Sequence, residues 1–201
     1  MDLLSIKGQM ADPNIMMSRA EANQQFCGGG FFCHFFPFQS RGQFLGSHKI
    51  FIPYQPFQVR IVNRGCELVH HLALDSVTGE LDLHCVELTW NEDDILPPES
   101  DHVLMSRLSL DCMQEVLLDQ VRRRVYLSGF FGLQNLSIDA QTTGPEIYLP
   151  YWVGFYRKKD RVGIDVIDAY RKKPEGAKIR NLIFEWLKEQ SSSYWAPFHV
   201  G

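Results

Sequence analysis

Alternating hydrophobic and polar residues predict a β-hairpin in the first half of the chain. In residues 57–61, Phe, Val and Ile alternate with Gln and Arg, and this period of two is typical of a strand with one face in water. A turn is predicted at residues 63–65, after which residues 66–74 return as a second strand. Residues 81–88 alternate again, so we expect a third strand and an antiparallel meander.

A second β-hairpin is predicted in the C-terminal half. Residues 147–156 form an apolar, aromatic-rich run, and the charged residues 157–161 predict the turn that follows it. Residues 162–170 then alternate between aliphatic and other residues, as expected for the returning strand.

Both hairpins begin with the same pattern. "IFIPYQPF" begins at Ile50 and "IYLPYWVGF" at Ile147, and each has an aliphatic, an aromatic and a second aliphatic residue before Pro-Tyr. Each hairpin ends with an aspartate, Asp75 or Asp168, ahead of a glycine-containing turn. The correspondence predicts an internal duplication, in which proline interrupts pairing on one side and aspartate binds backbone amides of the turn. The alternative is that unrelated hairpins use these residue types alike.

Three stretches carry the signals of helices. Ser18 is a good N-cap, and Glu21, three residues later, completes a capping box for a short helix. Ser109 can cap a longer amphipathic helix. The positive charges of its arginines lie near the C-terminal end, where they interact favourably with the helix dipole. A third amphipathic helix is predicted over residues 177–190.

These elements predict an α+β fold with two antiparallel β-hairpin or meander units, each packed with one helix. Seven Phe and three consecutive glycines in residues 26–49 predict an irregular backbone that lays aromatic rings against the core; a lid or docking segment is the alternative. The expected organisation is an N-terminal helix and Phe/Gly-rich segment (1–47), a first β unit (48–90), an acidic linker with prolines (91–101), a helix, second β unit and C-terminal helix (102–190), and an uncharged tail (191–201).

Composition narrows the class of protein. The chain has 201 residues, of which 45% are apolar and 22% charged, so it can bury a substantial core. A net charge of −4 argues against a general nucleic-acid binder, and no apolar run approaches the ~20 residues of a membrane span. Five cysteines without framework spacing fit reduced thiols, and the N-terminus lacks a secretory signal. We therefore predict a cytoplasmic location.

Charge is distributed unevenly along the chain. Residues 65–106 contain ten acidic residues and no Lys or Arg, whereas residues 156–190 contain ten basic and six acidic residues. The two regions can neutralise each other, pair between copies or face different partners. The alternative is a set of solvated turns, because Lys-rich hairpin tips also block aggregation.

The residues predicted to make contact with a partner are aromatic or basic. They are Tyr54, Tyr151, Trp152, Tyr156, Arg157, Lys158, Lys159 and Arg161. Aromatic and Arg side chains commonly anchor protein interfaces, although core packing is the alternative role of these rings. We predict a non-enzymatic protein-binding or assembly module without a cofactor, whose partner is another protein or a second copy of itself.

The rival hypothesis is a small metal-binding or thiol-dependent protein. Its candidate residues are Cys33, Cys66, His70, His84 and Cys85, with zinc or iron as the metal. Zinc prefers four thiolate or imidazole ligands, but the chain has no C-x-x-C motif, and the adjacent His70 and His71 face opposite sides of a strand. Motifs for serine hydrolysis and phosphate binding are also absent, so no enzyme class is favoured.

Overall fold

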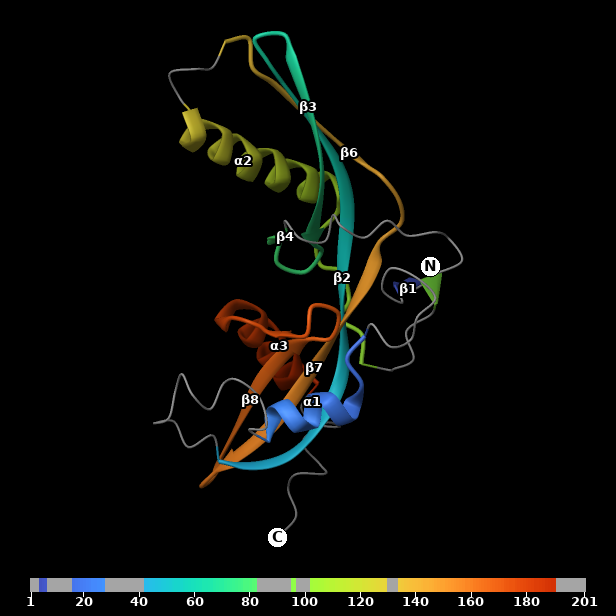
Figure 1. Ribbon diagram of the computed structural model, residues 1–201, viewed down its shortest axis with the longest axis vertical. Coiled ribbons are helices and arrows are strands. Elements are labelled where there is room, and N and C mark those ends of the chain that lie inside the picture. The colour runs from blue at the N-terminus through green and yellow to red at the C-terminus, as the bar shows by residue number, and fades with distance from the viewer. Residues whose placement is uncertain are drawn as a thin grey trace. The chain divides into compact units, whose positions relative to one another are not determined.

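The structure is a computed structural model that describes residues 4–6, 16–27, 42–82, 95–96, 102–129 and 134–190. The chain divides into two compact units that are interleaved in the sequence. Unit 1 contains Met1–Ala11 and Ile52–Leu149, and unit 2 contains Asp12–Phe51 and Pro150–Gly201. Figure 1 labels most of the helices and strands of the two units.

The sheet of unit 1 is built around the C-terminal part of β2 (Gln43–Asn63). On one side β2 pairs with β3 (Cys66–Asp75), and on the other with β6 (Ser137–Thr142), both antiparallel. The two residues of the β2–β3 turn, Arg64 and Gly65, have positive φ angles of 53° and 77°, as a tight hairpin requires. The predicted hairpin is therefore confirmed.

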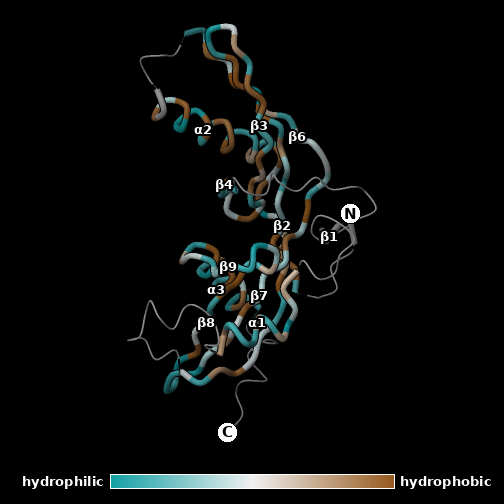
Figure 2. Tube along the Cα trace, viewed as in Figure 1, coloured by the Kyte–Doolittle hydropathy of each residue, from teal (hydrophilic) through white to brown (hydrophobic). Residues whose placement is uncertain are grey.

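Helix α2 (Leu110–Gly129) covers one face of this sheet, as Figure 1 shows. The hydroxyl of Ser109 accepts a hydrogen bond from the backbone N–H of Cys112, which confirms the predicted cap. Hydrophobic side chains of α2, β2, β3 and β6 form the core between the helix and the sheet. Figure 2 colours the trace of these elements by hydropathy. Its most buried members are Phe57, Val59, Leu74, Met113, Leu117, Val121 and Ala140.

Short strands complete unit 1. β4 (Leu81–Asp82) pairs with the end of β3 and begins the predicted third strand, the rest of which lies outside the described residues. β1 (Leu4–Ile6) pairs with β5 (Ile95–Leu96) and with Ile147 and Tyr148 at the start of β7 (Ile147–Lys158). None of the described helices is long and apolar enough to cross a membrane.

Two prolines, Pro53 and Pro56, lie inside β2. The β2–β3 ladder ends at the Tyr54↔Asp75 pair, next to Pro53. The β2–β6 ladder ends at the Phe57↔Thr142 pair, next to Pro56. Because proline has no N–H to donate, both prolines occupy places where β2 has reached the end of a ladder.

Unit 2 contains the N-terminal part of β2, the strand β7 (Ile147–Lys158) from Pro150 onward, and β8 (Arg161–Asp168). β2 and β7 are neighbours, and β7 forms a hairpin with β8. β9 (Lys173–Pro174) pairs antiparallel with the end of β8. Helix α3 (Ala177–Glu189) packs against β8 and buries Ile183, Trp186 and Leu187, so the second hairpin and the C-terminal helix are confirmed.

Helix α1 (Arg19–Phe26) begins with the predicted capping box, because Ser18 and Glu21 exchange both side-chain-to-backbone hydrogen bonds. Its Phe26 ring packs against β7 at Gly154. A Cβ atom at position 154 would lie 2.7 Å from that ring, closer than packed carbon atoms can approach. Glycine at this position therefore permits the helix to sit on the strand.

The two hairpins share a local geometry. Tyr54 pairs directly with Asp75 in unit 1, and Tyr151 pairs directly with Asp168 in unit 2. In each unit the residue after the aspartate donates its backbone N–H to the proline before the tyrosine, at 2.9 Å in unit 1 and 3.1 Å in unit 2. These are the residues that the sequence pattern aligned.

The turns after the two aspartates also correspond. Each carboxylate accepts the backbone N–H two residues later, and each aspartate carbonyl accepts the N–H four residues later. That fourth residue, Gly79 or Lys172, has positive φ in both units. This repeated Asx turn is what an internal duplication predicts, and common descent of the two units stays a prediction.

The predicted α+β fold class is confirmed. β2 begins at Gln43, so the last part of the segment expected to be irregular is a regular strand. Residues 28–41 and 191–201, which carry the rest of that prediction and the uncharged tail, lie outside the described residues.

Candidate functional site

The four aromatic residues predicted to contact a partner are buried inside the protein. They are Tyr54, Tyr151, Trp152 and Tyr156, which are each exposed by 6% or less. Within unit 2 the Trp152 indole donates a hydrogen bond to the carbonyl of Met17 at 2.8 Å, and the Tyr156 hydroxyl donates to the carbonyl of Phe26 at 3.0 Å. In this structure the rings have the core-packing role that was the alternative.

The basic residues of the predicted contact lie at the exposed tip of the β7–β8 hairpin. Lys158, Lys159 and Arg161 are exposed, and Arg157 is half-buried. Lys159 has a positive φ of 55°, because it occupies the tight turn between the strands. A contact role of this tip stays a prediction.

The candidate metal ligands are only partly described. Cys66 and His70 are exposed on β3, while Cys33, His84 and Cys85 lie outside the described residues. No group of three or more His, Cys, Asp or Glu side chains in the described parts of the chain could hold a metal ion. The metal-binding hypothesis therefore gains no support from the residues that are described.

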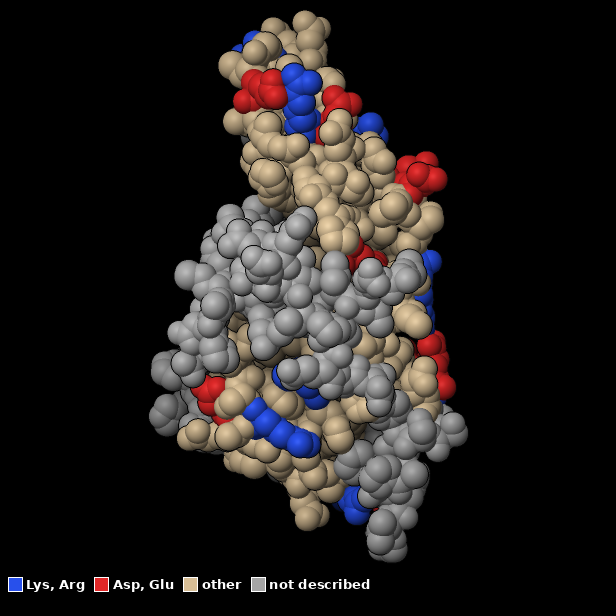
Figure 3. Space-filling model, turned by 90° about the vertical axis from the view of Figure 1, so that its right-hand side faces the viewer, with Lys and Arg blue, Asp and Glu red and all other residues tan. Residues whose placement is uncertain are grey.

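The sheet of unit 1 has a polar face opposite α2. Since side chains alternate along a strand, the residues between those that pack on the helix point to this face. They are Gln58, Arg60 and Val62 of β2, Glu67, Val69 and His71 of β3, and Ser137, Asp139 and Gln141 of β6. Acidic and basic side chains are mixed on the view of Figure 3, without a tract of one sign among the described residues. We call these nine residues the open face.

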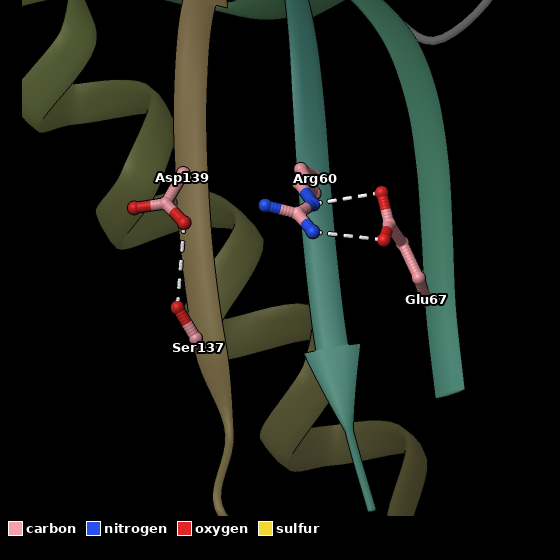
Figure 4. Close-up of polar contacts among 4 residues, drawn as sticks. All are labelled: Arg60, Glu67, Ser137 and Asp139. Carbon is pink, nitrogen blue, oxygen red and sulfur yellow. Dashed lines mark hydrogen bonds and ion pairs between the residues drawn. The ribbon is translucent and has the colours of Figure 1, made fainter. Parts of the chain in front are cut away.

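Arg60 lies at the centre of the open face. Its guanidinium donates two hydrogen bonds to Glu67, with N···O distances of 2.7 and 2.9 Å, and Asp139 lies on the neighbouring strand (Figure 4). The hydrogen bond from Arg60 lowers the pKa of Glu67, and the same bond raises the pKa of Arg60. Both side chains are exposed, so the pair orients two charges toward solvent and adds little stability.

The outer edge of β3 presents backbone groups that have no strand partner within the described ranges. A two-residue turn makes Asn63 and Cys66 a hydrogen-bonded pair, so every second residue from Cys66 bonds back to β2. The residues between them, Glu67, Val69 and His71, direct their N–H and C=O groups away from β2. The β3–β4 ladder reaches only Ala73, and among the described residues no strand pairs with β3 before it.

The opposite edge of the same sheet, β6, is partly covered by α2. The side chain of Gln114 donates a hydrogen bond at 2.8 Å to the carbonyl of Ala140. This carbonyl points away from β2, because Arg60 and Asp139 form the hydrogen-bonded pair next to it. The contrast identifies β3 as the less protected edge of unit 1.

The unpaired part of β3 also exposes apolar side chains. Leu68 is 59% exposed on the α2 side of the strand, and Val69 is 45% exposed on the open face. The strand contains no Lys, Arg or Pro, which are residues that commonly protect sheet edges. We call Cys66–His71, with its free backbone groups and these two side chains, the β3 edge.

A separate polar cluster joins Ser106, Glu146 and Tyr148. Both hydroxyl groups donate to the Glu146 carboxylate, at 2.5 Å from Ser106 and 3.1 Å from Tyr148. Burial, together with the negative charge of Glu146, raises the pKa of Tyr148 to about 12. The phenol therefore stays protonated at neutral pH and serves as a hydrogen-bond donor, not as a base.

Replacing Asp75 by Asn tests the buried turn of unit 1. Burial, more than any other effect, raises the pKa of Asp75, although hydrogen bonds from Thr78 and Val77 oppose it. The pKa of Asp75 is therefore higher in the folded chain than its ordinary value of 3.8. As the pH rises through the range between these two pKa values, the carboxyl ionises more readily in the unfolded chain, so the folded protein loses stability. Asn does not titrate, so the free energy of unfolding of D75N should improve relative to the native protein as pH rises.

Urea unfolding between pH 4 and pH 7, followed by circular dichroism, measures this difference, which we expect to shift in favour of D75N as the pH rises. Ser76→Ala is the control, because it alters a neighbouring buried hydroxyl that has no hydrogen-bond partner among the described residues. Its difference from the native protein should not depend on pH. A pH-independent difference for D75N would contradict the raised pKa.

Comparisons of the chain with protein families, with curated proteins and with solved structures give no match. Sequence patterns did not identify the β3 edge as a site, although one signal was present. The run "CELVHH" reads as a strand without Lys, Arg or Pro, but only the pairing of the strands shows which side of it is free.

Proposed function

We propose that the chain is a protein-binding or assembly module, not an enzyme, and that its contact surface is the β3 edge with the adjoining open face. The observation that carries this proposal is the exposure of β3 from Cys66 to His71, with outward backbone groups at every second residue. A partner strand can add to such an edge, because main-chain hydrogen bonds supply affinity and alternate side chains supply specificity.

The charged surfaces have a secondary part in this proposal. The basic tip of the β7–β8 hairpin, with Lys158, Lys159 and Arg161, can speed the encounter with an acidic partner. Screening by salt should weaken such steering. The short-range contacts of the β3 edge should depend on salt much less.

Capture from an extract of the source cells tests the proposal with the substitution Val69→Pro. The N–H of Val69 points away from β2, so proline removes an outward donor without breaking the β2–β3 ladder. The tagged full chain and its variant are cross-linked to their partners, which are quantified by mass spectrometry. We expect at least one protein, another copy of the chain included, to be recovered about tenfold less with V69P.

Thr142→Pro is the matched control. Thr142 is exposed at the end of β6 and its N–H also points away from β2, but at the opposite edge of the sheet. This variant should recover the same partners as the native chain, and urea unfolding should show that both variants fold. Equal recovery of all partners by the native chain, V69P and T142P would refute binding through the β3 edge.

A further inference from the structure

We propose that the partner of the β3 edge is a second copy of this chain, which pairs with it antiparallel across a twofold axis at Val69. This inference rests on the proposed function and names its partner. It follows from the distribution of residues about Val69, which makes the edge complementary to itself. Homodimers of this symmetry require such a self-complementary surface.

The backbone groups of the edge match their own symmetry mates. In this register Val69 faces Val69 of the second copy, and Glu67 faces His71 of the second copy. These three residues carry the outward N–H and C=O groups of the β3 edge. Each facing pair can exchange two hydrogen bonds, so every outward group between Glu67 and His71 gains a partner. Shifting the register by two residues in either direction leaves some of these groups without one.

The side chains of the open face are complementary in the same register. Opposed residues on antiparallel strands lie on the same face of the sheet, so the Glu67 carboxylate meets the His71 imidazole of the second copy on both sides of the axis. Glu67 is already held by Arg60, which keeps its carboxylate on this face. On the axis, Val69 contacts Val69 of the second copy. Each of these side chains is 45% exposed in the single chain, and the contact buries part of that apolar surface.

The opposite face gains apolar cover. In this register Leu68 lies opposite His70 of the second copy, one residue to either side of Val69. Leu68 is 59% exposed in the single chain, so the pairing covers part of its apolar surface. A twofold axis perpendicular to the sheet places the two α2 helices on one face of the combined sheet and the two open faces on the other. The side chains that already pack against α2 therefore keep their neighbours.

In the part of the chain that the structure describes, the edge lacks the devices that would prevent this pairing. Natural edge strands carry Lys, proline, a bulge or an inward charge to block self-association, and β3 has no Lys or Pro and an unbroken ladder with β2 from Asn63↔Cys66 to Tyr54↔Asp75. At the other edge, Gln114 already occupies the carbonyl of Ala140. A contact of a few residues is small, so we expect a dissociation constant in the micromolar range or weaker.

Sedimentation equilibrium of the full chain at about 5–500 µM tests the proposal. We expect a monomer–dimer equilibrium for the native chain and for T142P, and at least about tenfold weaker association for V69P. A purified native chain that stays monomeric over the whole range would overturn the second copy as partner. In that case, a loss of captured proteins from the extract with V69P would still support binding through the β3 edge. The result that overturns the second copy as partner therefore differs from the result that refutes the proposed function.

Charge-swapped variants test the register. His71→Glu places like charges opposite each other on both sides of the axis and should weaken the dimer about fivefold, and Glu67→His should also weaken it. The double variant E67H/H71E restores a Glu–His pair on both sides of the axis and should return the dissociation constant to within about twofold of the native value. Absence of this rescue would overturn the proposed register.

Amide hydrogen exchange identifies the occupant of the edge. The amides of Glu67, Val69 and His71 should exchange rapidly in dilute native chain and slow down as the concentration rises. Slow exchange of these amides in a chain shown to be monomeric would mean that other residues of the same chain cover the edge, and would overturn the proposal.

Discussion

Replacing Trp152 by Ala is expected to lower the free energy of unfolding by about 3–5 kcal/mol. The indole is buried with Met17, Ala22, Phe26 and Ile167 in unit 2, and its removal leaves a large cavity. The carbonyl of Met17 also loses the hydrogen bond that the indole N–H donates at 2.8 Å. Urea unfolding followed by circular dichroism measures the loss.

Two further variants separate packing from surface contact. Trp152→Phe keeps most of the ring but removes the N–H, so it should cost about 1–3 kcal/mol. Lys158→Ala, on the exposed end of the same strand, should change stability by less than about 0.5 kcal/mol. If W152A kept the native stability but no longer bound a partner, Trp152 would be an interface residue. That result would contradict its buried position in the structure.

The elements that could be predicted from the sequence are those with a local cause. The hairpin turn at Arg64–Gly65, the Ser18 cap and the apolar stripe of α2 each depend on a few neighbouring residues. Alternation in residues 57–61 also identified the buried face of β2, because one side of that strand packs on a helix and the other is open.

The role of the aromatic residues in β7 was harder to predict. Residues 147–156 are all buried, so the strand has no wet face and no alternating pattern to show one. A continuous apolar run of this kind is typical of a strand covered on both sides. Tyr and Trp also occur at interfaces and in cores alike, and the two roles differ only in what the other parts of the chain place against them.

The β3 edge could not be located from the sequence because an edge is a property of the sheet. The local pattern of "CELVHH" is the same in a central strand and in an edge strand. The free side becomes evident only from the β2–β3 register and from the place where the β3–β4 ladder stops, at Ala73. The open face needs a further long-range pairing, since β6 reaches β2 from about eighty residues away in the chain.

Replacing Asp168 by Ala is expected to lower the free energy of unfolding by about 2–4 kcal/mol. Its buried carboxylate accepts the backbone N–H groups of Tyr170 at 2.7 Å and Arg171 at 2.8 Å, and it pairs with the Arg171 side chain at 3.4 Å. Alanine leaves these donors without their acceptor in the turn that leads to α3. Asp168→Asn keeps an acceptor oxygen and should lose less than half as much.

Asp165→Ala is the matched control on the same strand. Asp165 is half-buried, and its contact with Arg180 is long, at 3.8 Å, so its loss should cost less than about 1 kcal/mol. Since Asp75 holds the corresponding turn of unit 1 with the same pattern of backbone bonds, Asp75→Ala should resemble D168A and not D165A. Chemical denaturation of the three variants compares them directly. If D168A and D165A were equally mild, the carboxylate would not hold the turn, and the shared Asx geometry would not explain why both hairpins end in aspartate.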